Sequence, residues 1–154
     1  MSDGLEVLEE WAGALLAKLE PGERRKLLGT MVRNLRGDQQ KRIALQRSPD
    51  GKPYEPRKRQ HLQAKKGRIK GQMFRKLRGV RYMRTEHSVN GISLGFVGRA
   101  ARIARVHHYG LVDDMNKAQA PIRYPERKVL GFGSSELNHI RDMLISRLSA
   151  LSAS

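Results

Sequence analysis

Leucines recur at three- and four-residue spacing near the N-terminus and predict an amphipathic helix over residues 3–19. Glu20-Pro21-Gly22 ends this helix and starts a second one, expected over about residues 22–47. The apolar positions of the second helix become sparse after Leu35, and residues such as Gln39 and Arg42 follow. We therefore expect its last turns to present a polar surface.

The second half of the chain alternates between strand and helix patterns. Residues 79–97 predict a β-hairpin, because apolar and polar residues alternate on both sides of the turn signal Asn90-Gly91. Helical spacing returns over residues 99–109 and is closed by Gly110. Residues 111–133 are expected to be irregular with one short strand, since two prolines interrupt them. Ser134 or Ser135 is expected to cap a last helix from about 136 to 151.

This order of elements predicts one small α+β domain over residues 1–154, with N-terminal helices, a hairpin-based antiparallel sheet, a short central helix and a C-terminal helix. Its length of 154 residues suffices for one modest core. The large apolar residues expected in that core, with no functional role, include Trp11, Leu16, Phe96, Ile103 and Leu144.

A long basic arm or loop is expected at about residues 52–78. The turn signal Ser48–Pro53 precedes it, and residues 54–72 hold almost no large apolar side chains besides Tyr54, Leu62 and Ile69. Such a segment cannot bury enough surface to offset the entropy of ordering it. The candidate contact residues on this arm are its basic side chains: Arg57, Lys58, Arg59, Lys65, Lys66, Arg68, Lys70, Arg75, Lys76 and Arg78.

The net charge of the chain is concentrated in this region. The protein has 31 Lys+Arg against 15 Asp+Glu, a net charge of +16, and residues 31–84 carry a net of about +15. A nucleic-acid backbone or an acidic protein surface could neutralise this segment, and composition does not separate the two. An anionic membrane fits less well, because the basic stretch lacks a regular apolar face.

The residues contain no recognisable catalytic or cofactor-binding pattern. With no cysteine, thiolate catalysis, disulfides and Cys-ligated zinc are excluded. His107-His108 are neighbours and cannot chelate one metal as an i, i+4 pair could, and we interpret Asp113-Asp114 as a solvated loop pair. We expect no enzyme, no cofactor, no metal and no membrane span, and a protein made in a reducing cytoplasm.

Nine short motifs occur in an order that resembles the phage tail completion, or virion morphogenesis, family of contractile-tailed temperate phages. The resemblance covers most of the chain, from about residue 5 to 150. It rests on the order in which the motifs follow one another. The motifs are residues 39–44, 49–57, 65–69, 73–78, 95–99, 103–107, 109–111, 124–127 and 130–132.

This resemblance implies a non-enzymatic virion protein that acts late in tail assembly, at the head-proximal end or neck, after assembly in the host cytoplasm. A more distant likeness to head–tail joining proteins implies a hexameric ring around the DNA channel, with other tail and neck proteins as partners and non-specific contact with the DNA. Arg99, Arg102 and Arg105, at three-residue spacing on the helix over 99–109, are the candidate ring contacts. A basic nucleic-acid-binding module is the alternative, and residues 112–120 receive no role.

Overall fold

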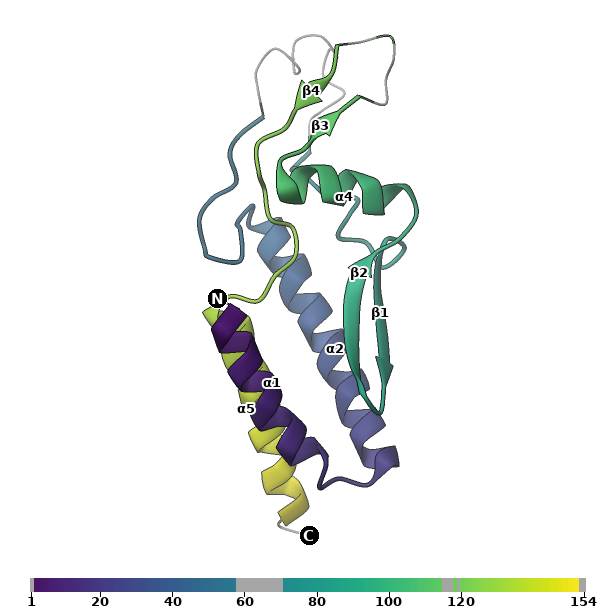
Figure 1. Ribbon diagram of the computed structural model, residues 1–154, viewed down its shortest axis with the longest axis vertical. Helices are drawn as coiled ribbons and strands as arrows, with labels where there is room; N and C mark the ends of the chain where they lie inside the picture. The colour runs from purple at the N-terminus through teal and green to yellow at the C-terminus, as the bar shows by residue number, and fades with distance from the viewer. Residues whose placement is uncertain (1, 58–70, 115–117, 119, 153–154) are drawn as a thin grey trace. The chain divides into compact units, whose positions relative to one another are not determined.

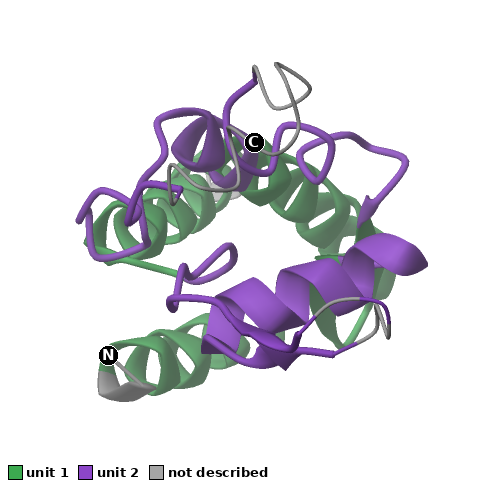
Figure 2. Cartoon of the chain, turned by 90° about the horizontal axis from the view of Figure 1, so that it is seen from above, with its two compact units in different colours: residues 1–38, 84–95, 132–154 green, residues 39–83, 96–131 purple. Residues whose placement is uncertain are grey.

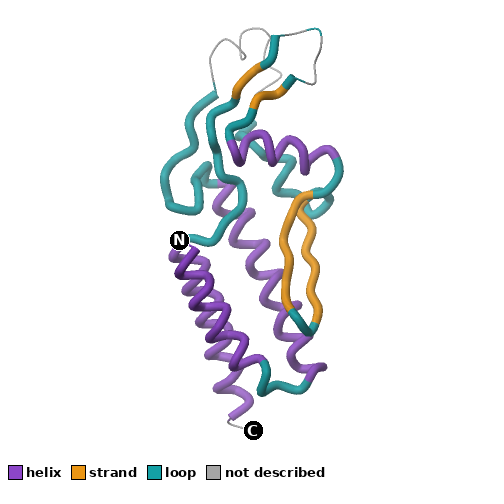
Figure 3. The backbone as a smooth tube through the Cα atoms, viewed as in Figure 1, coloured by secondary structure: helices purple, strands orange, loops and turns teal. Residues whose placement is uncertain are grey.

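The computed structural model describes residues 2–57, 71–114, 118 and 120–152. Over these residues the chain forms four helices and four strands (Figures 1 and 3). This composition confirms the α+β class. None of the helices in the described residues is long and apolar enough to cross a membrane. The elements are α1 (Ser2–Leu16), α2 (Pro21–Ala44), β1 (Met83–Ser88), β2 (Gly91–Phe96), α4 (Arg99–Tyr109), β3 (Val112–Asp113), β4 (Ile122–Arg123) and α5 (Ser134–Ser152).

The chain divides into two compact units, coloured separately in Figure 2. Unit 1 comprises residues 1–38, 84–95 and 132–154, and unit 2 comprises residues 39–83 and 96–131. Along the chain, the boundary falls inside α2 and at the ends of the hairpin strands. The single domain over residues 1–154 stays a prediction.

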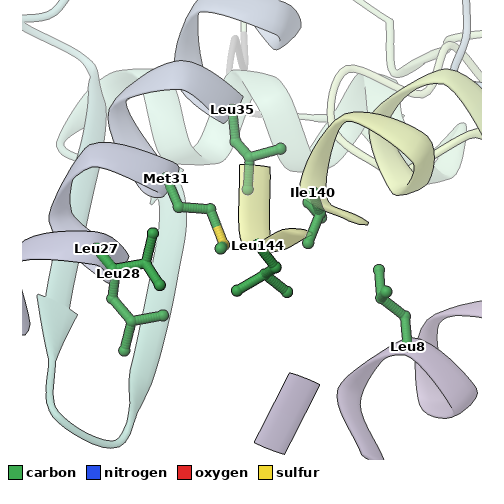
Figure 4. Packing of buried hydrophobic residues seen from close by; sticks show 7 residues of the cluster. All are labelled: Leu8, Leu27, Leu28, Met31, Leu35, Ile140 and Leu144. Carbon is green, nitrogen blue, oxygen red and sulfur yellow. The ribbon is translucent and has the colours of Figure 1, made fainter. Parts of the chain in front are cut away.

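Unit 1 holds the main apolar core. Leucines and Met31 on α2 meet Leu8 of α1 and two residues of α5, because the apolar positions of each helix fall on one face (Figure 4). Helix α1 contacts α5 directly, and Ile92 of β2 packs against the same cluster. The buried members are Leu8, Leu27, Leu28, Met31, Leu35, Ile140 and Leu144.

Two of the five predicted core residues are wrong. Trp11 is 36% exposed, because it lies beside the stripe of α1 that carries Leu8 and Ala12 rather than on it. Ile103 is 43% exposed, because α4 buries the face that carries Ala100 and Ala104 instead. Leu144 is fully buried, Leu16 packs against the core of unit 1, and Phe96 is half-buried.

Helix α5 begins earlier than expected, and neither serine caps it. The backbone N–H of Gly133 donates to the Glu136 carboxylate at 3.0 Å, and the N–H of Leu137 donates to the Gly133 carbonyl at 3.1 Å. Glu136 therefore reaches back to the residue before the helix, as the acidic member of a capping box does. A glycine in the cap position allows the helix to start at Ser134.

The hairpin is shorter than its sequence pattern. Strand β1 starts at Met83, because the backbone N–H groups of Tyr82 and Met83 donate to the Gly79 carbonyl at 3.0 and 2.9 Å and form a turn. Val80 and Tyr82, expected in the strand, belong to this turn. The tight turn before Gly91 is as expected.

In unit 2, α4 is followed by two antiparallel strands of two residues each. Gly110 ends α4 in the left-handed conformation (φ 63°, ψ 48°), and the Leu111 N–H donates to the Val106 carbonyl at 2.8 Å. Strands β3 and β4 pair antiparallel, with Val112 opposite Arg123 and Asp113 opposite Ile122. The region expected to hold one short strand thus holds two, and Asp113 is a strand residue instead of a loop residue.

Candidate functional site

Of the basic arm expected at about residues 52–78, the structure describes residues 52–57 and 71–78, both in unit 2. We call residues 54–57 its first root and residues 71–78 its second root. Four of the ten candidate arm residues lie there: Arg57, Arg75, Lys76 and Arg78. Arg75 and Lys76 are exposed, whereas Arg57 and Arg78 are half-buried. The other six candidates lie outside the described residues: Lys58, Arg59, Lys65, Lys66, Arg68 and Lys70.

The first root is held by a buried tyrosine and a buried arginine. The Tyr54 hydroxyl donates to the Lys128 carbonyl at 2.9 Å, and burial raises the pKa of Tyr54, which keeps the hydroxyl a donor. Arg127 donates from Nε to the Glu55 carbonyl at 2.7 Å and from Nη2 to the Pro56 carbonyl at 3.1 Å. One planar guanidinium therefore fixes two consecutive peptide groups of the root.

The second root is held by two glutamines, Gln40 of α2 and Gln46 of the turn that follows α2. The Gln46 side chain accepts from the Met73 N–H at 3.1 Å and donates to the Met73 carbonyl at 2.9 Å. Gln40 donates to the Arg78 carbonyl at 2.7 Å, and Leu77 between these points is buried. Side-chain amides thus replace the missing backbone partners of an irregular segment.

The two roots meet each other. Arg57 Nη1 donates to the Gly71 carbonyl at 2.7 Å, and the Tyr54 and Phe74 rings contact edge to face at 5.5 Å between centroids. The residues that flank positions 58–70 therefore lie in contact with each other. The sequence between them carries six Lys and Arg in 13 positions. The described residues thus hold together the two segments that flank this strongly basic stretch of sequence.

A buried arginine organises the residues beneath the first root. Arg42 is 9% exposed and donates to the carbonyls of Val129, Lys128 and Arg47 at 3.0, 3.3 and 3.1 Å. It also donates to the side chain of Gln39, which is fully buried and donates in turn to the Gly131 carbonyl at 3.0 Å. The network satisfies carbonyls that no strand or helix pairs.

The expectation of a polar surface on the last turns of α2 is therefore wrong for Gln39 and Arg42. Both residues are polar because they bind the irregular segment over residues 128–131, not because they face solvent. Composition cannot distinguish these two uses of a polar side chain. One feature of the sequence could have indicated a specific role for these residues. Gln39 and Arg42 lie in the first of the nine motifs, residues 39–44, and Arg127 lies in the eighth, residues 124–127.

The part of the chain that matches known proteins contains all nine motifs. Residues 3–149 match the phage virion morphogenesis family. This chain belongs to that family. It is 36% identical over 141 residues to tail completion protein S of Escherichia phage P2, covering 91% of this chain and 94% of that protein. No solved structure is significantly similar to the present chain.

Membership of this family gives the protein a structural role in making the phage virion. The arginine network and the arm roots both lie within the matched residues. No group of three or more His, Asp or Glu side chains that could hold a metal occurs among the described residues.

His107 connects the arm roots to α4. Its ring lies between Phe74 and Tyr124, with centroids 5.0 and 4.5 Å away, and Arg127 Nη1 faces His107 Nδ1 at 3.4 Å. Burial and the positive charge of Arg127 lower the pKa of His107 to about 4. The imidazole is therefore neutral at pH 7 and can accept through Nδ1.

This depressed pKa predicts an acid-sensitive fold. Because the unfolded imidazole titrates near 6.5 and the folded one near 4, unfolding takes up a proton between these values. The stabilisation from His107 is complete above about pH 6.5 and is lost as the pH falls toward 4. We expect a loss of about 2 kcal/mol after allowing for partial exposure. Urea unfolding of the native protein and of His107→Phe at both pH values measures it.

The variant His107→Phe is the control, because both proteins contain the same Asp and Glu side chains and differ only in His107. His107→Phe keeps an aromatic ring between Phe74 and Tyr124 but has no proton to take up. An identical pH dependence in the two proteins would contradict the assignment.

The three candidate ring contacts are exposed on α4. Arg102 forms an ion pair with Asp113 of β3, which shows that part of its role lies within unit 2. Arg99 and Arg105 make no side-chain hydrogen bond or ion pair within the part of the chain that the structure describes.

Proposed function

We propose that this protein completes a phage tail at its head-proximal end and takes part in head–tail joining, as one subunit of a ring at the neck. The observation that carries the proposal is the similarity to the tail completion protein of phage P2, which extends over nearly all of both chains. The protein works by docking to other tail and neck proteins rather than by catalysis.

The basic arm is the proposed docking element. Arg57, Arg127 and Gln46 fix the two roots of the arm in unit 2 and hold them together. Its six positive charges suit an acidic surface on a neighbouring ring. Non-specific contact with DNA in the channel uses the same charges.

The first test is to locate the labelled protein in purified particles by electron microscopy. Label at the head–tail junction, with several copies in a ring, supports the proposal. Absence from finished particles contradicts the ring at the neck and leaves an assembly factor or the alternative, a nucleic-acid-binding module. That alternative predicts DNA affinity that falls steeply with salt, with a slope set by the number of phosphate contacts.

Reversing the arm charges is expected to block tail joining. We expect the quadruple Glu variant of Lys65, Lys66, Arg68 and Lys70 to lower the infectious titre at least about a hundredfold, since several like-charge contacts cost several kcal/mol. The measurement is complementation of a phage that lacks the gene. Normal titres would contradict the role of the arm.

The matched control reverses four exposed basic residues of unit 1 and changes the net charge equally. The control positions are Arg25, Lys26, Arg84 and Arg141. Circular dichroism melts of both variants verify that each remains folded. The control is expected to retain the native titre, which separates the arm from net charge.

A further inference from the structure

Helix α1 carries an acidic outer face. Glu6, Glu9 and Glu10 are exposed, and their spacing of three and four residues places them on one side of the helix, away from Leu8. None of the three makes an ion pair within the described residues. In a protein of net charge +16, such an unpaired acidic group is a local exception.

Two exposed apolar side chains border this acidic face. Val7 is 66% exposed, and Trp11, one turn further along α1, is 36% exposed. The core of unit 1 takes Leu8 and Ala12 from the opposite side of the helix. The outer face of α1 therefore combines three carboxylates with an aliphatic and an aromatic group, and a face that complements it would be basic with apolar neighbours.

Helix α4 carries a positively charged face that also includes exposed apolar and aromatic side chains. Arg99, Arg102 and Arg105 are exposed, and Ile103 and Tyr109 beside them are 43% and 64% exposed. Arginine and tyrosine are enriched in protein interfaces, because a guanidinium can bind a carboxylate through two parallel hydrogen bonds and can stack on an aromatic ring. Trp11 offers such a ring.

We propose that the acidic face of α1 in one copy of this chain docks on the arginine face of α4 in a second copy. The faces match in charge and in apolar content, and they lie on different parts of the chain. A contact between two different surfaces is heterologous, and repetition of one such contact builds a ring when the rotation between subunits closes. This inference rests on the ring of the proposed function and names both surfaces of its subunit contact.

The test uses reciprocal charge reversal in phage complementation. The α1 variant carries Glu9→Lys and Glu10→Lys, and the α4 variant carries Arg99→Glu and Arg105→Glu. Each alone is expected to lower the infectious titre at least about tenfold, because it opposes like charges across the contact. All four changes in one chain restore the opposite signs, leave the net charge at +16, and are expected to recover the titre.

The control for net charge joins the α1 reversal to Arg25→Glu and Arg141→Glu, which are exposed but lie off α4. This chain also has a net charge of +16 and is expected to stay defective. Recovery in the control, or no recovery in the four-fold α1/α4 variant, would overturn the proposal. Circular dichroism of each variant excludes loss of the fold as the cause of a defect.

A second readout uses the absence of cysteine from the chain. Glu9→Cys and Arg105→Cys in one chain are expected to form a ladder of disulfide-linked subunits in oxidised particles, whereas either change alone is expected to give none. Particles that hold a ring of the protein without such a ladder overturn the α1–α4 contact and leave the proposed function standing. Particles with a single copy overturn the ring itself.

Discussion

Arg42→Leu is expected to lower the free energy of unfolding by about 3–5 kcal/mol. The leucine fills part of the space but donates nothing to the carbonyls of Lys128 and Val129, which Arg42 reaches at 3.3 and 3.0 Å. It also removes one of the two donors to the buried Gln39 Oε1, which then keeps only the Gly131 N–H at 3.2 Å. Urea unfolding followed by circular dichroism at pH 7 measures the loss.

Arg47→Leu is the matched control for this prediction. Arg47 is exposed and donates to a single carbonyl, that of Gly51, at 2.8 Å. Its replacement is expected to cost no more than about 1 kcal/mol, because water can take over the hydrogen bond. An equal decrease in the free energy of unfolding of the two variants would contradict a stabilising role of the buried network beyond that of an exposed hydrogen bond.

Arg127→Leu is expected to cost about 3 kcal/mol and, separately, to raise the pKa of His107. The stability loss follows from the carbonyls of Glu55 and Pro56, which lose their donor at the first arm root. The pKa change follows from removing a positive charge that disfavours the imidazolium. Unfolding experiments give the first quantity, and NMR titration of the His107 ring gives the second.

A second variant separates the two effects. Arg127→Lys keeps the positive charge but loses the planar arrangement of donors, so we expect lower stability with the pKa of His107 still depressed. Arg123→Leu, which removes an exposed donor to the Gly110 carbonyl, is expected to change neither quantity appreciably. A pKa of His107 that stays near 4 in Arg127→Leu would contradict the role of this charge.

Local signals determined most of the elements. The leucine spacing predicted α1 and the core half of α2, and Gly110 ended α4 where the sequence placed its end, because left-handed backbone strongly favours glycine. The class of the fold and the concentration of charge in the arm also followed from the residues. The family followed from the order of motifs that are individually weak.

Tertiary structure alone decided which polar residues are buried. Gln39, Arg42 and Arg127 have the composition of a solvated surface, yet each lies beneath irregular backbone and satisfies its carbonyls. It also decided that Ile103 faces outward and that Asp113 belongs to a strand. The physical reason is the sequence distance over which the interactions act. A helix or a turn is set by neighbours a few residues apart, whereas the Lys128 and Val129 carbonyls that Arg42 binds lie more than 80 positions away.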